Sequence, residues 1–166
     1  DVPLQEGPNS IAARAVDTLG HAAETAPATV TRDTLPPQIA ITEPAAGAQL
    51  TSRTVTVRGT AVDPHLDEVT VLGVEATVSG TAFEATVELP EGASEITAHA
   101  VDRLGHEADA APVPVVVDTQ APVVRLDSPE DPLVATATVT VTGTVEEPHL
   151  DEVEVAGIPT TVAADG

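Results

Sequence analysis

The sequence predicts an all-β fold built of tandem immunoglobulin-like β-sandwiches, and three observations predict it. Apolar residues alternate with threonine, glutamate and other polar residues over short segments, which is the pattern of strands that bury one face. Glycine and proline turns separate these segments at regular intervals. The sequence also repeats itself at a spacing of about 85 residues, which is the size of one small domain.

Seven segments of one repeat carry the alternating pattern. They are Gln38–Ile41, Thr54–Val57, Glu68–Val71, Ala76–Val78, Ala82–Val87, Ile96–Val101 and Val113–Val117. Turn pairs such as Leu72-Gly73 and Ser79-Gly80 lie between them. Seven short strands at this spacing are typical of an immunoglobulin-like sandwich, and we expect no helix of useful length.

The internal repeat defines the expected domain organisation. AVDTLGH at 15–21 returns as AVDRLGH at 100–106, and GTAVDPHLDEV at 59–69 returns as GTVEEPHLDEV at 143–153. We therefore expect three pieces: the C-terminal half of one repeat at 1–34, a complete repeat at 35–119 and the N-terminal half of the next repeat at 120–166.

Two interpretations of the half-repeats stay open. In the one we favour, the chain is a segment of a longer array, and its partners are neighbouring repeats of the same chain. In the other, half-domains of different chains complement each other head to tail or laterally, because an unpaired strand edge accepts a strand from a neighbour. The second interpretation predicts a self-assembling filament.

Composition limits the partners and the setting. The chain has 27 acidic residues and only six basic ones, giving a net charge of −21. This charge repels nucleic acid and anionic membrane surfaces, so we expect neither as a partner. There is no cysteine for a disulfide or a thiolate metal site. An acidic chain of this kind fits an extracellular, salty or calcium-containing setting, although a merely solvated surface explains it equally well.

The core must be built from small aliphatic side chains. Phe83 is the single aromatic residue, and the chain has no tryptophan, tyrosine or methionine. We expect Phe83 to fill the centre of the core of the complete repeat. Small side chains bury less apolar area each, which predicts modest stability.

The motifs together resemble a known family. They are PxIxITxP at 37–44, TVTVxGT at 54–60, VTVxG at 69–73, Phe83, LxEG at 89–92, AxDxxG at 100–105 and DTxxP at 118–122. This order resembles the bacterial Ig-like repeat of large surface and adhesin proteins, in particular the type represented by glucodextranase domain B. The resemblance implies a non-catalytic extracellular module in a stalk or fibre that displays a distal domain. That family usually has asparagine after the AxDxxG motif, whereas this chain has His21 and His106.

Carboxylates gather where we expect the linker and two loops to meet at one end of the sandwich. Ca²⁺ takes six to eight oxygen ligands in loose geometry and relieves the repulsion between such groups. Calcium at domain junctions stiffens bacterial Ig-like stalks, and the resemblance implies it as one interpretation here. In the other interpretation, the aspartates accept backbone N–H bonds and cap turns. The candidate ligands are Asp33, Asp63, Asp67, Asp102, Asp109, Asp118 and Asp151.

Two histidines fall in the same loops. With Asp102, His65 and His106 form an alternative set of ligands for a transition metal. The competing interpretation is that both are exposed loop residues.

We expect no enzymatic activity. The sequence has no nucleophile elbow, phosphate-binding glycine loop or His-Glu-x-x-His motif. A carbohydrate-binding accessory module is the remaining alternative, but sugar recognition usually relies on aromatic platforms, which a chain with one phenylalanine lacks.

Overall fold

The computed structural model describes residues 1–128, 133, 135, 137–147 and 149–163. The chain forms two compact units, Asp1–Asp118 and Thr119–Gly166. All regular elements in the described part are strands, so the all-β prediction is confirmed. No helix in that part is long and apolar enough to span a membrane. The unit boundary after Asp118 lies one residue from a predicted repeat boundary; the division into two half-repeats and one complete repeat stays a prediction.

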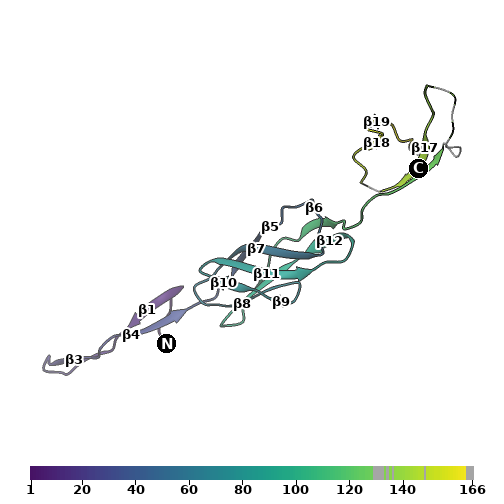
Figure 1. Cartoon of the computed structure of the whole chain (residues 1–166). Coiled ribbons are helices and arrows are strands. Elements are labelled where there is room, and N and C mark those ends of the chain that lie inside the picture. The colour runs from purple at the N-terminus through teal and green to yellow at the C-terminus, as the bar shows by residue number, and fades with distance from the viewer. Residues whose placement is uncertain (129–132, 134, 136, 148, 164–166) are drawn as a thin grey trace. The chain divides into compact units, whose positions relative to one another are not determined.

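The first unit contains a two-layered β-sandwich (Figure 1). One layer is an antiparallel sheet with the strand order β10-β11-β7-β5. Its strands are β5 (Gln38–Glu43), β7 (Thr54–Val62), β10 (Thr77–Ser79) and β11 (Ala82–Glu88).

The opposite layer consists of two sheets, with the orders β14-β13-β8-β9 and β12-β15-β6. Only the pairing of β6 with β15 is parallel within this layer. Its strands are β6 (Ala48–Leu50), β8 (Leu66–Val71), β9 (Val74–Glu75), β12 (Gly92–Ile96), β13 (Ala98–Asp102), β14 (Glu107–Asp109) and β15 (Val113–Val117).

One predicted strand is wrong in its extent. The segment Ile96–Val101 is two strands, because the chain changes partner at Thr97: β12 pairs with β15, and β13 pairs with β8. The Thr97 carbonyl accepts a hydrogen bond from the Leu72 N–H at the crossing. The short strands β6, β9 and β14, and β12 before Ile96, are further elements that the sequence pattern did not indicate.

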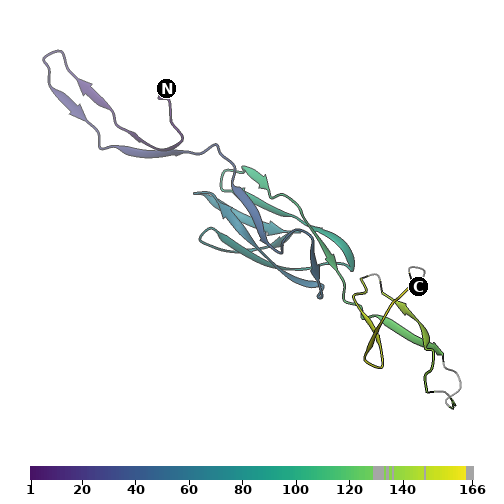
Figure 2. The same cartoon turned by 90° about the horizontal axis from the view of Figure 1, so that it is seen from above.

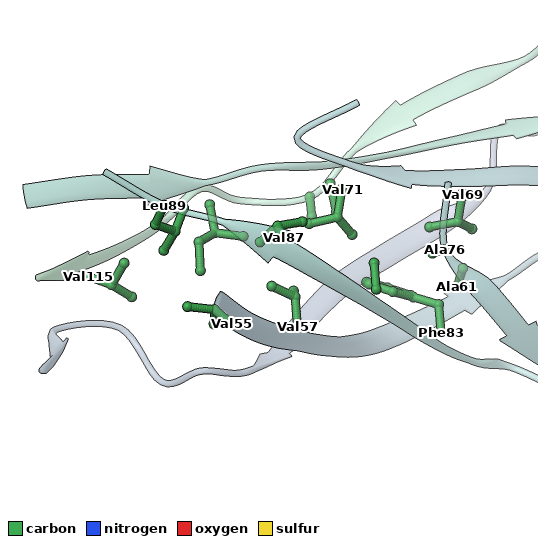
Figure 3. Close-up of a cluster of buried hydrophobic side chains, with 14 of the residues drawn as sticks. Val55, Val57, Ala61, Val69, Val71, Ala76, Phe83, Val87, Leu89 and Val115 are labelled. Carbon is green, nitrogen blue, oxygen red and sulfur yellow. The ribbon is translucent and has the colours of Figure 1, made fainter. Parts of the chain in front are cut away.

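The core lies between the layers and is made largely of valine and alanine. Alternate residues of β7 and β11 are buried, as the period-2 pattern predicts. Figure 3 shows the labelled side chains of both layers filling the space between the sheets, Phe83 among them. The side chain of Phe83 is buried, with the residue 2% exposed.

Gly59 makes room for this ring. A Cβ atom at Gly59 would lie 2.3 Å from Phe83 Cζ and 2.3 Å from the carbonyl oxygen of Ala40 on the neighbouring strand. Because neither distance is compatible with a side chain, glycine at this position lets the aromatic ring and the β5 backbone approach β7.

Residues 1–34 form the same strand pairs as the end of the complete repeat. The pair of β1 (Gly7–Ile11) with β4 (Ala28–Arg32) has the register Gly7↔Arg32, and the equivalent pair of β12 with β15 has Gly92↔Val117. In the same way, β2 (Arg14–Val16) pairs with β3 (Ala22–Glu24) as β13 pairs with β14. Figure 2 shows these strands from above. The pairing is thus set by local sequence.

The second unit repeats the beginning of the sandwich. Its strands are β16 (Val123–Ser128), β17 (Thr142–Glu146), β18 (Val153–Val155) and β19 (Ile158–Thr160). The β16–β17 pair has a register shift between Leu126 and Ser128, and the β5–β7 pair has the same shift between Ile41 and Glu43. Equivalent sequence positions therefore have the same backbone irregularity in both repeats.

Candidate functional site

The turn between β13 and β14 is organised by a buried aspartate. Asp102 Oδ1 accepts hydrogen bonds from the backbone N–H groups of Leu104 (2.8 Å) and His106 (2.9 Å). Asp102 Oδ2 lies 2.6 Å from Nδ1 of the His106 ring. The Asp102 side chain is fully buried, whereas that of His106 is 32% exposed.

The same arrangement occurs in the partial repeat. Asp17 Oδ1 accepts hydrogen bonds from the N–H groups of Leu19 (2.9 Å) and His21 (2.8 Å), and His21 Nδ1 lies 2.8 Å from Asp17 Oδ2. Histidine thus extends the aspartate-capped turn with a side-chain contact in both repeats. The turn-capping interpretation of Asp17 and Asp102 agrees with these contacts.

The linker brings a second carboxylate, that of Asp33, close to the Asp102 turn. Asp33 Oδ2 lies 2.6 Å from Nδ1 of His65, in the loop between β7 and β8. Asp33 Oδ1 accepts a 3.3 Å hydrogen bond from the Leu35 N–H, as expected for a linker cap. Within the β7–β8 loop, Asp63 Oδ1 accepts a 2.6 Å hydrogen bond from the His65 N–H.

These residues form two overlapping groups of metal-ligating side chains that share Asp33. One group is Asp33, Asp102 and His106, and the other is Asp33, Asp63 and His65; within each, the candidate ligand atoms lie within 4.8 Å of one another. The Arg103 N–H donates a 3.0 Å hydrogen bond to the His65 carbonyl and so ties the two loops together. We call the five residues the junction cluster: Asp33, Asp63, His65, Asp102 and His106.

The charges of the junction cluster shift the pKa values of one pair. The hydrogen bond with Asp102 raises the pKa of the His106 imidazole above its usual value despite burial, and the negative charges of Asp102, Asp33 and Asp63 add to this effect. Burial acts to raise the pKa of the Asp102 carboxyl, but the hydrogen bonds from His106 and Leu104 together hold it below its ordinary value. The pair therefore favours imidazolium beside carboxylate.

The other predicted ligands lie outside the junction cluster. Asp67 is exposed and lines an open surface groove of about 590 Å³ together with Asp63. Asp109 lies on β14, where its carboxylate contacts His99 Nδ1 at 2.8 Å. Asp118 is the repeat equivalent of Asp33, and its N–H donates a 2.9 Å hydrogen bond to the Leu50 carbonyl. Asp151 is exposed in the second unit.

The oxygen atoms available in the junction cluster are few for calcium. One oxygen of each aspartate accepts a backbone N–H bond, and the second oxygens of Asp33 and Asp102 contact imidazole nitrogens. Ca²⁺ takes six to eight oxygen ligands and has little preference for imidazole. Calcium binding here stays a prediction, and it would require further oxygens from elsewhere.

The linker is also held by a residue that the sequence reasoning missed. Glu6 accepts hydrogen bonds from the Thr34 N–H at 2.8 Å and from the Thr34 hydroxyl at 2.9 Å, and it lies 3.3 Å from the Arg32 guanidinium. Glu6 is part of the repeated Leu-x-Glu-Gly motif, as is Glu91. The recurrence of that glutamate beside a recurring Asp-Thr pair was the signal that could have identified it.

A two-layered sandwich with capped turns and a braced linker defines an immunoglobulin-like repeat module. The comparison with known families agrees, since the profile of the family described as glucodextranase, domain B matches residues 37–119. The chain belongs to this family.

Comparisons with individual proteins match segments of this chain. Bacillopeptidase F of Bacillus subtilis (strain 168) is 33% identical over 104 residues, which cover 63% of this chain and 7% of that protein. The chain thus spans a small fraction of its relative's length. Among solved structures, the chain is similar to the fibronectin(III)-like modules of Clostridium thermocellum CbhA, with a TM-score of 0.40, 17% identity and coverage of 51% of this chain and 99% of that one. It is also similar to a modular endo-beta-1,4-mannanase from Cellulomonas fimi, with a TM-score of 0.39, 24% identity and coverage of 54% and 20%.

Proposed function

We propose that the chain is a non-catalytic spacer of an extracellular bacterial protein, in which successive Ig-like repeats hold another domain away from a cell surface. The observation that carries the proposal is the two-sided anchoring of the linker. Thr34 is bonded by Glu6 of the preceding repeat, and the adjacent Asp33 contacts His65 of the following repeat. A spacer needs such contacts because an unanchored linker lets neighbouring domains move independently.

Other features support a spacer over a binding module. Phe83, the single aromatic side chain, is buried and offers no stacking platform to a sugar. The charge of −21 keeps neighbouring acidic chains apart. The relative Bacillopeptidase F is many times longer than this chain, which is what a module of a larger protein requires. The alternative of a self-assembling filament stays a prediction.

The absence of cysteine permits a direct test of linker anchoring. Spin labels are attached to Thr31→Cys on β4 and Thr86→Cys on β11, both at exposed positions, and the distance between them is measured by electron–electron double resonance. We expect a narrow distance distribution that broadens clearly in Glu6→Gln and in His65→Gln. His99→Gln is the matched control, since His99 contacts Asp109 away from the linker. Equal widths in all four proteins would mean that the linker is a flexible tether.

A further inference from the structure

The junction cluster has more negative charge than its neighbours balance. The side chain of Asp102 is fully buried and that of Asp33 is 9% exposed. Within the described first unit, the arginine ion pairs are with Glu6, Glu43 and Glu84, and the chain contains no lysine. The imidazoles of His65 and His106 contact the carboxylates of Asp33 and Asp102. Buried carboxylates are stable only when they are paired or hydrogen-bonded, and a divalent metal ion pairs with several of them at once.

The donor atoms suit a metal that accepts nitrogen. Each group of three combines two carboxylates with one imidazole, and both groups contain Asp33. Ligands of a tetrahedral Zn²⁺ lie about 2.0–2.2 Å from the metal, so pairs of them are about 3.4 Å apart. The donor atoms of each group fall within 4.8 Å of one another, so side-chain rotations suffice to reach that spacing. The 2.6 Å contact of His65 with Asp33 then opens slightly as the metal comes between the two side chains.

We propose that the junction cluster binds one divalent cation of the zinc class, with Asp33, Asp63 and His65 as ligands and Asp102 and His106 beside them. The ligands come from the linker and from the β7–β8 loop of the complete repeat, so the cation joins the linker to the sandwich. The inference is independent of the spacer function, because metal binding is measured directly.

The next repeat carries the same donor types. Asp118, Glu147 and His149 stand at the positions of Asp33, Asp63 and His65. Within the second unit, the His149 N–H donates a 3.0 Å hydrogen bond to Glu147 Oε1, as the His65 N–H does to Asp63. The replacement of aspartate by glutamate keeps the carboxylate, and the loop keeps its local contact.

Zinc binding to the whole 166-residue chain tests the proposal by isothermal titration calorimetry. We expect saturable binding at micromolar zinc or below. His65→Gln should weaken binding by at least about tenfold, whereas His106→Gln and His99→Gln should bind as the native chain does. His65→Cys should retain zinc, because a thiolate replaces the imidazole ligand. Equal affinity in all these variants, or no saturable binding below millimolar zinc, would overturn the proposal.

Two further measurements separate the outcomes. X-ray absorption at the zinc edge of the native chain should show imidazole scattering, and this result does not depend on the folding of any variant. Millimolar calcium should leave zinc bound. If calcium displaces the zinc, or if zinc is coordinated by oxygen alone, the site is a carboxylate cage and the assignment of histidine ligands is wrong.

Discussion

Replacing Gly59 by alanine tests whether the core is built around the contact of Phe83 with the β7 backbone. The new Cβ would lie 2.3 Å from the Ala40 carbonyl oxygen and 2.3 Å from Phe83 Cζ, more than 1 Å closer than an ordinary contact of about 3.4–4.0 Å. The carbonyl belongs to the neighbouring strand, so the backbone of β5 must move as well as the ring. Overpacking costs about 1–3 kcal/mol, and the two simultaneous clashes place Gly59→Ala at the upper end, about 3 kcal/mol.

The sign of this effect is informative. On strand propensity alone, alanine would stabilise a strand interior relative to glycine by about 0.5–1 kcal/mol. A loss of about 3 kcal/mol corresponds to a fall of roughly 12–24 °C in melting temperature for a domain of this size. The assay is thermal and urea unfolding followed by far-ultraviolet circular dichroism, with Thr60→Ala on the exposed face of β7 as the control. An unchanged or raised melting temperature in Gly59→Ala would refute the packing argument.

A double-mutant cycle separates the two clashes. Phe83→Leu removes the ring but leaves the Ala40 carbonyl in place. We expect Gly59→Ala to cost about 1 kcal/mol less in the Phe83→Leu background than in the native chain, as residues in contact show coupling of this order. Additive effects would mean that the ring moves freely and that the β5 backbone carries the whole cost.

Three further predictions concern the charged groups. In EDTA, the raised pKa of His106 means that its contribution to stability is complete below about pH 6.5 and is lost as the pH rises through its pKa in the folded state. The lowered pKa of Asp102 means that its contribution to stability is present above about pH 4 and is lost on acidification. The melting temperature should therefore decline above about pH 6.5 in the native chain but not in His106→Gln, and equal profiles would contradict the assignment. Asp102→Ala should lower the melting temperature by roughly 10 °C. Asp102→Asn should lower it by less, because the asparagine side chain still accepts hydrogen bonds from the Leu104 and His106 N–H groups. If calorimetry shows a lower melting temperature for Asp102→Asn than for Asp102→Ala, the capping role is wrong. Arg58 lies on the surface between Glu43 and Glu84, so Arg58→Ala should change the melting temperature by less than roughly 3 °C, and a larger loss would show that this surface network matters for folding.

The alternating pattern predicts strands well but does not reveal their partners. Ile96 and Ala98 are buried and Thr97 is exposed, so the alternation continues unbroken through the point where the chain leaves β15 for β8. The prediction of one strand at Ile96–Val101 was wrong for this reason. The three-residue strand β6 was missed because Ala48–Leu50 is too short to show a period, and its parallel pairing with β15 is set by the fold.

The site was predictable where a motif is local. The Asp102 turn lies within seven residues and recurs at Asp17, so its hairpin role could be inferred from the repeat. Topology alone places Asp109 at the same end of the sandwich, but its side chain pairs with His99 across β13 and β14 instead of joining the junction cluster. The bonds of Glu6 with Thr34 join residues 28 positions apart; the recurrence of both motifs marks the two residues as candidates but does not show that they are in contact.

The matching strand pairs of residues 1–34 and of the complete repeat have a consequence for misfolding. Because β12–β15 and β13–β14 reproduce the registers of β1–β4 and β2–β3, this part of a repeat is interchangeable between neighbours. One repeat can therefore donate its last strands to the next and accept those of the previous one, with every backbone pair within the exchanged part preserved. Similarity between adjacent repeats thus creates a domain-swapping hazard, which divergence at facing core positions would reduce.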